Sequence, residues 1–209
     1  MPVYRSGEAP PGWCELSAFD ILDLPEGEII EHERRGRKER LLATAGTTQL
    51  LLPDGSVVLK EGQFVDLPTA ESWRLRACSP KAQLVRLSGR WGRDLGGCGI
   101  FRVVEQEAPV NIGDPVDYPK RTSVDSHYHD CDEYWILLEG GGTVVVGDRH
   151  MSVQAGDCVP IGMGHHHDLP LVGAPVKSVF FETTLEREKR VGHLWTHTHG
   201  RARPRLERI

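Results

Sequence analysis

The stretch HYHDCDEYWILLEGGGTVVVGD, residues 127–148, combines strand-forming residues with side chains that bind metal ions. Its apolar runs YWILL and TVVV are short, rich in aromatic or β-branched residues and separated by glycines, which is typical of β-strands. Because side chains alternate between the two faces of a strand, His127 and His129 are expected to project to the same side. Two imidazoles held in this way can bind one metal ion.

The rest of the chain also predicts β-structure. Short alternating or branched segments recur, including TTQLLL, GSVVLKEG, SWRLRA and AQLVRL in the first half and HMSVQAG and PVKSVFFET in the second. The segment LPDGSV predicts a hairpin in which Asp54 and Gly55 supply positive backbone dihedrals. The main helix candidate is TTLEREKRVG, residues 183–192, with Thr184 as a possible cap. The chain is therefore predicted to be all-β.

Composition excludes several classes of function. The 209-residue chain has a net charge of -5 and no long basic face, which argues against nucleic-acid binding. Its apolar runs are too short to span a bilayer, and the opening MPVYRSGEAPPGWCEL lacks the apolar core of a signal peptide. The five cysteines form no CxxC pair. We therefore expect a cytoplasmic protein with no membrane or nucleic-acid partner.

The sequence contains an internal repeat with an offset of 94 residues. The matched pairs are Glu39 with Glu133, Gly46 with Gly140, Asp54 with Asp148, Gly62 with Gly156, Trp73 with His167 and, after one extra residue in the first copy, His32 with His127 and Arg34 with His129. A fixed offset over this length indicates two copies of one β-unit. The glycine-rich segment SGRWGRDLGGCG between the copies suits a linker, and the N-terminal GEAPPGW is expected to be irregular.

A second histidine cluster follows in the second copy, where GDCVPIGMGHHHDLP places three consecutive histidines after a glycine-rich turn. Three imidazoles and one carboxylate would form a mixed nitrogen and oxygen site. Such a site suits Fe(II), Mn(II), Co(II), Ni(II) or Zn(II) and leaves coordination positions open for substrate or water.

These motifs resemble those of the cupin superfamily. The pattern His127-x-His129-x3-Glu133-x6-Gly140 matches its first motif, except that Arg121 stands where a glycine is usual. The pattern Gly156-x5-Gly162-x-Gly164-x2-His167 matches its second motif, with glycine where a proline is usual. The resemblance implies one divalent metal ion per chain, bound by the residues His127, His129, Glu133 and His167.

The resemblance also implies a fold and a domain organisation. It suggests two tandem double-stranded β-helix (jelly-roll) barrels, so that the chain resembles a bicupin. We expect a degenerate N-terminal barrel at residues 15–92, a metal-binding C-terminal barrel at 98–184 and a C-terminal tail at 185–209. Edge strands of cupin barrels often pair between chains, so the resemblance also implies a homodimer.

The first copy is predicted to bind no metal. Arg34 stands at a ligand position and has no lone pair to donate. Trp73 would fill the volume of the missing imidazole, and Arg34 is expected to form an ion pair with Glu39. In the second copy, Glu133 and His165 are the candidate catalytic residues, the latter as a proton shuttle because it shares strand parity with His167. His166 is expected to point away from the site.

Two classes of function remain open at this stage. The first is a metal-dependent enzyme that acts on a small polar metabolite, either a dioxygenase, which we favour, or a sugar or keto-acid isomerase or lyase on the same site. The second is a cupin that binds a metal or a small ligand without turnover. A base beside an open metal position would favour the enzyme, whereas a dry aromatic pocket would favour binding without turnover.

The C-terminal tail is charged, yet Leu194 and Trp195 give it two apolar anchors. We expect it to dock on the exterior of the barrel, because ordering a chain segment costs backbone entropy that packing must offset. A lid over the site is the alternative, in which His197 and His199 would form a second His-x-His pair.

Overall fold

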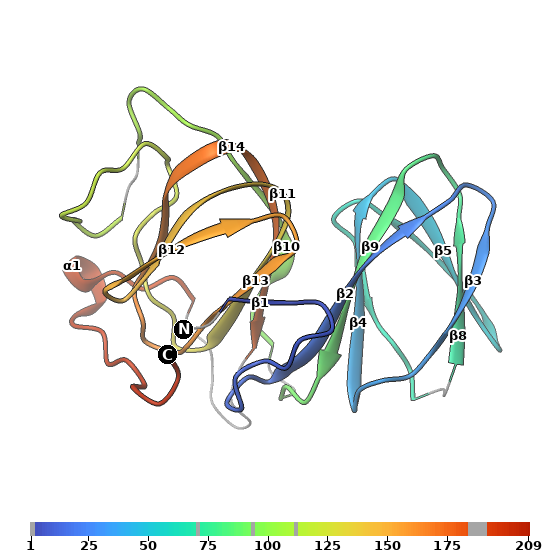
Figure 1. The fold of residues 1–209 in the computed structure, drawn as a ribbon. Helices are drawn as coiled ribbons and strands as arrows, with labels where there is room; N and C mark the ends of the chain where they lie inside the picture. The colour runs from blue at the N-terminus through green and yellow to red at the C-terminus, as the bar shows by residue number, and fades with distance from the viewer. Residues whose placement is uncertain (1–2, 70–71, 93–94, 111–112, 184–191) are drawn as a thin grey trace. The chain divides into compact units, whose positions relative to one another are not determined.

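The computed structural model describes residues 3–69, 72–92, 95–110, 113–183 and 192–209. The chain divides into two compact units. We call them the N-terminal unit, formed by Ser6–Pro10 and Glu15–Arg90, and the C-terminal unit, formed by Met1–Arg5, Pro11–Cys14 and Trp91–Ile209. Both units are built from β-strands (Figure 1), which confirms the prediction of an all-β fold.

The N-terminal unit consists of two four-stranded sheets around one core. The first sheet has the order β2 (Leu16–Leu24), β9 (Ala82–Gly89), β4 (Lys38–Ala45) and β7 (Phe64–Asp66). The second has the order β3 (Ile29–Glu33), β8 (Ser72–Ala77), β5 (Thr47–Leu52) and β6 (Gly55–Lys60). Leucines from both sheets, including Leu41, Leu50 and Leu84, are fully buried between them.

The hairpin predicted from LPDGSV is present, but its turn lies one residue earlier than expected. Leu52 pairs with Gly55, so Pro53 and Asp54 are the turn residues. The pyrrolidine ring of Pro53 fixes its φ near -65°. The predicted positive dihedrals at Asp54 and Gly55 are not adopted by these described residues. The chain therefore turns at Pro53 and Asp54 without the positive dihedrals that the prediction required.

The C-terminal unit is one six-stranded sheet with the order β1-β13-β11-β14-β10, in which β12 also pairs with β11. The strands are β1 (Tyr4–Arg5), β10 (Cys98–Val103), β11 (Asp132–Val146), β12 (Arg149–Gln154), β13 (Asp157–Ile161) and β14 (His167–Thr183). In the described residues this sheet ends at β1 and β10 rather than closing on itself. Its core is formed mainly by valines and leucines around Trp135.

Register shifts bend the long pair β11 and β14. They fall between Leu137 and Val145, where the sequence has three consecutive glycines. Gly140 has a positive φ of 73°, and a Cβ atom there would meet the backbone of Pro175. A Cβ atom at Gly142 would meet the backbone of Leu171. The glycines therefore allow β14 to follow the bend closely, as bulges in curved sheets require.

Strand pairing follows the sequence offset of 94 residues in both units. The corresponding pairs are Glu39↔Ser88 with Glu133↔Glu182, Leu41↔Arg86 with Trp135↔Phe180, and Arg40↔Asp66 with Tyr134↔Pro160. The bridge between His127 and His167 likewise corresponds to the pairing of His32 with Trp73. The repeat seen in the sequence is thus a repeat of strand register.

The terminal segments contain little regular structure. The segment GEAPPGW, residues 7–13, forms no strand or helix, as expected, whereas Tyr4 and Arg5 before it form β1, which pairs with β13. Most of the helix predicted at residues 183–192 lies outside the described residues. The described helix is the four-residue α1 (Thr196–His199). Among the described residues, no helix is long and apolar enough to cross a membrane.

Candidate metal centre

The structure brings together the four residues predicted to bind metal. Ligand atoms of His127, His129, Glu133 and His167 all lie within 4.8 Å of one another. All four side chains are buried. His127 and His167 lie opposite each other in an antiparallel bridge, in which the His167 amide donates to the His127 carbonyl at 2.8 Å. Glu133 enters from the start of β11.

Backbone carbonyls fix the orientation of two imidazoles. His127 Nδ1 lies 2.8 Å from the carbonyl oxygen of Asp125, and His167 Nδ1 lies 3.0 Å from that of His165. A carbonyl oxygen only accepts hydrogen bonds, so each Nδ1 carries the proton and donates it. In the neutral ring the Nε2 lone pair is then left pointing into the cluster, the tautomer that outer-shell hydrogen bonds impose on metal-binding histidines.

The inward-facing atoms have no hydrogen-bond partner within the described part of the chain. They include Nε2 of His127 and of His167, both ring nitrogens of His129 and Oε2 of Glu133. His167 Nε2 lies only 3.0 Å from Glu133 Oε2, and His129 Nδ1 lies 3.3 Å from the same oxygen. Two acceptors at this separation repel each other unless a cation lies between them, and leaving them unpaired in the interior costs several kcal/mol.

The titration behaviour of the cluster is compatible with cation binding. Burial raises the pKa of Glu133, but the adjacent imidazoles of His129 and His167 outweigh this effect and hold the pKa well below the usual value. Burial is the largest influence on His127 and lowers the pKa of its imidazole. An ionised carboxylate and a neutral imidazole are the forms that bind a metal ion. The donor set of three nitrogens and one oxygen fits a divalent transition metal.

A second buried carboxylate, Glu182, lies beside the cluster and was not found by sequence analysis. It is the register partner of Glu133 on β14, and its Oε1 lies 3.6 Å from His129 Nε2. Its other oxygen accepts a hydrogen bond from the Gly97 amide. The repeat partner of Glu182 is Ser88, an uncharged residue. The repeat therefore gave no indication of a carboxylate at this position.

The C-terminal segment, residues 192–209, contributes a residue to the site. Leu194 and Tyr128 exchange backbone hydrogen bonds at 2.9 and 3.0 Å, so the segment forms an antiparallel bridge with residues 127–129, the His-x-His segment. The ring of His193 consequently stacks on that of His127, with centroids 3.9 Å apart and planes inclined by 10°. Trp195 Nε1 donates to Asp125 at 2.9 Å. A hydrogen bond to Asp125, the largest influence, raises the pKa of His193.

The expectation that the tail packs on the exterior was therefore wrong in part. Leu194 and Trp195 anchor the tail as predicted, but His193 lines the pocket beside the candidate metal site. His197 instead contacts Asp114 at 2.7 Å, and His199 accepts a hydrogen bond from the Trp195 amide. No spacing rule could find His193, because its partner strand lies more than 60 residues earlier in the chain.

The structure does not bring His165 to the site. Its Nε2 donates to the carbonyl oxygen of Arg205 at 2.9 Å, and it does not line the pocket beside the cluster. The parity argument failed because β14 begins only at His167 and the preceding residues form a turn. His166 points away from the cluster, as expected, and contacts Asp114 at 2.9 Å.

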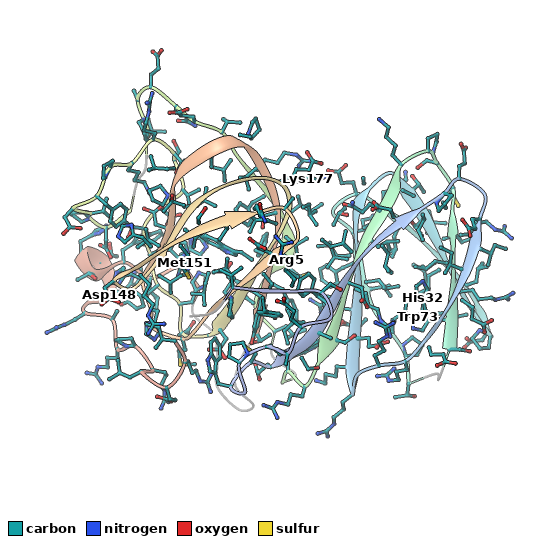
Figure 2. All side chains as sticks on the ribbon, in the orientation of Figure 1. Arg5, His32, Trp73, Asp148, Met151 and Lys177 are labelled. Carbon is teal, nitrogen blue, oxygen red and sulfur yellow. The ribbon has the colours of Figure 1, made fainter. Side chains whose placement is uncertain are left out.

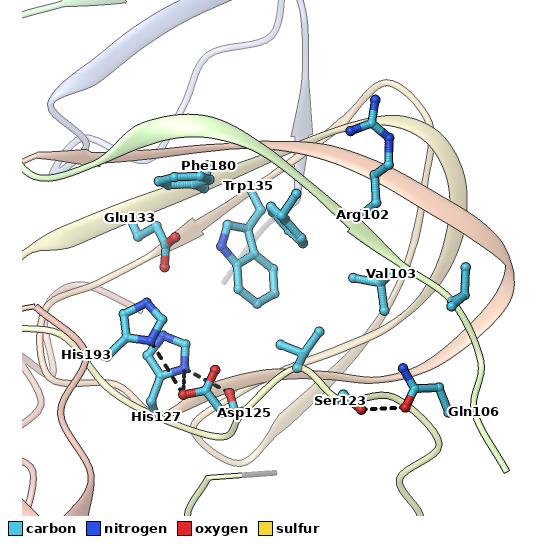
Figure 3. A pocket seen from close by; sticks show the side chains of 13 residues that line it. Arg102, Val103, Gln106, Ser123, Asp125, His127, Glu133, Trp135, Phe180 and His193 are labelled. Atoms are coloured by element: carbon cyan, nitrogen blue, oxygen red, sulfur yellow. Dashed lines mark hydrogen bonds and ion pairs between the residues drawn. The ribbon is translucent and has the colours of Figure 1, made fainter. Parts of the chain in front are cut away.

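A pocket of about 450 Å³ opens from the cluster (Figure 3). Its metal-binding end is formed by His127, Glu133, Asp125 and His193. The remaining lining residues are Phe101, Arg102, Val103, Val104, Gln106, Ser123, Val124, Trp135 and Phe180. A small molecule in this pocket would reach the open side of a bound ion.

The equivalent place in the N-terminal unit is filled differently. His32 stacks on Trp73 with centroids 4.6 Å apart, and Figure 2 shows the two side chains together. Glu39 forms an ion pair with Arg86 at 2.5 Å, both side chains being buried. The predicted pair with Arg34 was wrong, because Arg34 donates instead to backbone carbonyls, including that of Gly36. Trp73 is buried in the core, as predicted.

Comparisons with known proteins agree with this fold and site. Residues 116–180 match the family model of the cupin domain, Cupin_2. This match lies within the C-terminal unit and contains all four clustered residues His127, His129, Glu133 and His167. Over its full length the chain is 52% identical to the protein y4oW of Sinorhizobium fredii (strain NGR234), covering 97% of that protein, and it belongs to the same family.

Solved structures show the same fold at low sequence identity. An IolB-like protein from Salmonella typhimurium LT2 superposes with a TM-score of 0.57 at 16% identity, over 87% of this chain and 88% of that one. A mutant of oxalate decarboxylase from Bacillus subtilis gives a TM-score of 0.57 at 12% identity, over 85% of this chain and 71% of that one. Another structure of that decarboxylase concerns its Mn(II) centres.

Proposed function

We propose that the C-terminal unit is a metal-dependent enzyme that acts on a small metabolite. One divalent ion would be held by His127, His129, Glu133 and His167. The observation that carries this proposal is the 3.0 Å distance between His167 Nε2 and Glu133 Oε2. Both atoms are buried acceptors without a hydrogen-bond partner in the described residues, and a cation bound by both would remove their repulsion. The pocket that opens beside them supports a site that substrate can reach, rather than a purely structural ion.

Iron, manganese, nickel, cobalt and zinc are all compatible with this donor set. When bound, such an ion polarises a substrate oxygen or, if it is iron, binds dioxygen. We favour a dioxygenase, with a sugar or keto-acid isomerase or lyase as the alternative on the same site. Oxalate decarboxylase has the same fold and contains Mn(II) centres. This supports the proposal of a transition metal in our site but does not indicate which reaction the site performs.

Each residue around the ion has a distinct part in this proposal. The carbonyl groups of Asp125 and His165 fix the tautomers of two ligands, so the Nε2 lone pairs are already oriented before an ion arrives. His193 lines the pocket at the metal-binding end, where it would contact bound substrate. A proton shuttle at His165, the role inferred from strand parity, has no support from its position.

We further propose that the chain is a bicupin whose N-terminal unit is a degenerate copy without metal. The shared strand register supports a common origin of the two units. The Arg86 guanidinium beside Glu39 supports the absence of an ion there, because it already supplies the positive charge. The homodimer and the cytoplasmic location stay predictions.

An open coordination position is the property that separates an enzyme from a structural or storage-type cupin. Metal-free protein would be loaded with Co(II) and titrated with azide, a small anion that binds only where a position is free. We expect azide to change the visible spectrum of Co(II) protein, in wild type and in the His32→Ala control alike. Protein that binds Co(II) but shows no response to azide would contradict the enzymatic proposal.

A further inference from the structure

The pocket beside the metal centre changes in character along its length. At one end lie the ligands His127 and Glu133 together with His193 (Figure 3). Ser123 and Gln106 lie at the other end, where the Ser123 hydroxyl donates to the Gln106 side-chain oxygen at 2.6 Å. The wall between the two ends is apolar.

Three aromatic side chains dominate that wall. Phe101 on β10 packs against Trp135 with ring centroids 5.3 Å apart, and against Phe180 at 6.5 Å. Trp135 and Phe180 are register partners on adjacent strands, so their side chains share one face of the sheet. Val103, Val104 and Val124 complete this wall. An apolar or aromatic group of a ligand would lose its hydration and gain contacts here.

The size of the pocket excludes a good fit for a very small substrate. Its volume of about 450 Å³ is that of about 15 water molecules at about 30 Å³ each. A two-carbon acid bound at the metal would leave most of this apolar wall facing water. The sequence led us to expect a small polar metabolite, and the wall argues for a less polar one.

The charges around the proposed ion limit how many carboxylates the ligand can carry. A divalent ion held by Glu133 would also lie near two further carboxylates, Asp125 in the pocket wall and Glu182 beside His129, so little positive charge would remain for an anionic ligand. Arg102 is the one lysine or arginine among the described lining residues, and Figure 3 shows its guanidinium far from the metal-binding end. His193, the nearest other possible cation, is already paired with Asp125 at 3.5 Å. A second carboxylate on the ligand would therefore be buried beside these carboxylates without a cation of its own, which is strongly unfavourable.

We propose that this pocket binds a monocarboxylate that carries a second oxygen donor next to the carboxylate and an aromatic or branched apolar body. The two oxygens occupy open positions of the ion, and the body packs between Phe101, Trp135 and Phe180. This inference rests on the proposed metal-dependent function and names its substrate class. Phe101 is assigned as a specificity-determining residue.

Binding of three probes to Co(II)-loaded full-length protein tests the proposal. Phenylpyruvate has the head group and an aromatic body, pyruvate has the head group without the body, and oxalate has two carboxylates. Affinities would be measured from the visible spectrum of Co(II). We expect phenylpyruvate to bind at least about tenfold more tightly than either smaller acid, since even one buried methylene group contributes about tenfold or more.

The variant Phe101→Ala should remove this preference. Its affinity for phenylpyruvate should fall at least about tenfold, while its affinity for pyruvate stays unchanged. The matched control is Phe64→Ala on β7, which removes an aromatic ring that is 44% exposed in the N-terminal unit and should change nothing. If Phe101→Ala does not fold, as judged by circular dichroism, Phe180→Leu makes the same test at a neighbouring position of the same wall.

Equal affinity for phenylpyruvate and pyruvate, or tighter binding of oxalate, would overturn the proposed substrate class. If Phe101→Ala lost affinity for pyruvate and phenylpyruvate to the same extent, the proposed role of Phe101 would be overturned. These failures differ from failure of the proposed function, in which the protein would bind no Co(II) or would not respond to azide.

Discussion

The two units place a buried glutamate at the same point of the same strand register but provide its countercharge in different ways. In the N-terminal unit Glu39 Oε1 accepts hydrogen bonds from the Arg86 guanidinium, the Ser88 hydroxyl and the amides of Arg35 and Gly36. In the C-terminal unit Glu133 faces imidazoles whose inward Nε2 atoms have no hydrogen-bond partner in the described residues. The first glutamate has its cation within the chain, and our proposal supplies the second with a metal ion.

A single repeat position accounts for much of this difference. Arg86 pairs with Leu41 in one unit, and at the offset of 94 residues Phe180 pairs with Trp135 in the other. Replacing the arginine by phenylalanine removes the internal cation, and the phenylalanine lines a pocket instead. Trp73 likewise stands where the C-terminal unit has His167. The comparison shows how one β-framework holds either a closed core or a cluster of potential metal ligands beside a pocket.

Removing the internal cation should have the largest effect on stability. In Arg86→Leu the carboxylate of Glu39 stays buried without its partner, so we expect the free energy of unfolding to fall by about 3 to 5 kcal/mol. Urea denaturation followed by circular dichroism would measure it. In the control Arg40→Leu the free energy of unfolding should fall much less, because the partner of Arg40, Asp66, is 58% exposed and can be hydrated. Equal losses in the two variants would break the comparison drawn above.

Deletion of residues 192–209 should have a smaller effect. It removes the Arg208 guanidinium from Asp132, a buried carboxylate that lies 2.6 Å away, and leaves that group unpaired. Burial then raises the pKa of Asp132 without the opposing charge. We expect a loss of about 1 to 3 kcal/mol in the free energy of unfolding. Arg205→Ala, an exposed change in the same segment, is the control, and an unchanged melting temperature after deletion would show that the segment does not dock.

The smallest effect is expected at His32. In the N-terminal unit this ring stacks on Trp73 and lies where the C-terminal unit has His127. His32→Ala should leave the metal content of the protein unaltered, as measured by elemental analysis. If the metal content fell by half, the N-terminal unit would also hold an ion, and the distinction between the two units would be lost.

The sequence predicted the features that depend on local spacing. The alternation of strand faces placed His127 and His129 together, and the two glycine-rich motifs supplied Glu133 and His167. The offset of 94 residues predicted the repeat that the strand register later displayed.

Features that depend on which strands pair with each other could not be predicted from the sequence. The partner of Glu39 is Arg86 rather than the nearby Arg34, because β9 pairs with β4 and brings residues 47 positions apart into contact. His193 reaches the site through a pairing with Tyr128 that no periodicity reveals. His165 was misplaced because strand alternation was extended into a turn.

The metal content of protein purified without chelator, compared with that of His129→Ala, tests the central claim most directly. We predict one divalent ion per chain in the wild type and in the control His166→Ala, a weaker site in Glu133→Gln, and loss of most of the metal in His129→Ala. Protons compete for the ligands, and the pKa of His127 is lowered, so wild-type occupancy should fall only as the pH drops below about 6.5. A tightly held ion in His129→Ala protein would place the site elsewhere and contradict the account.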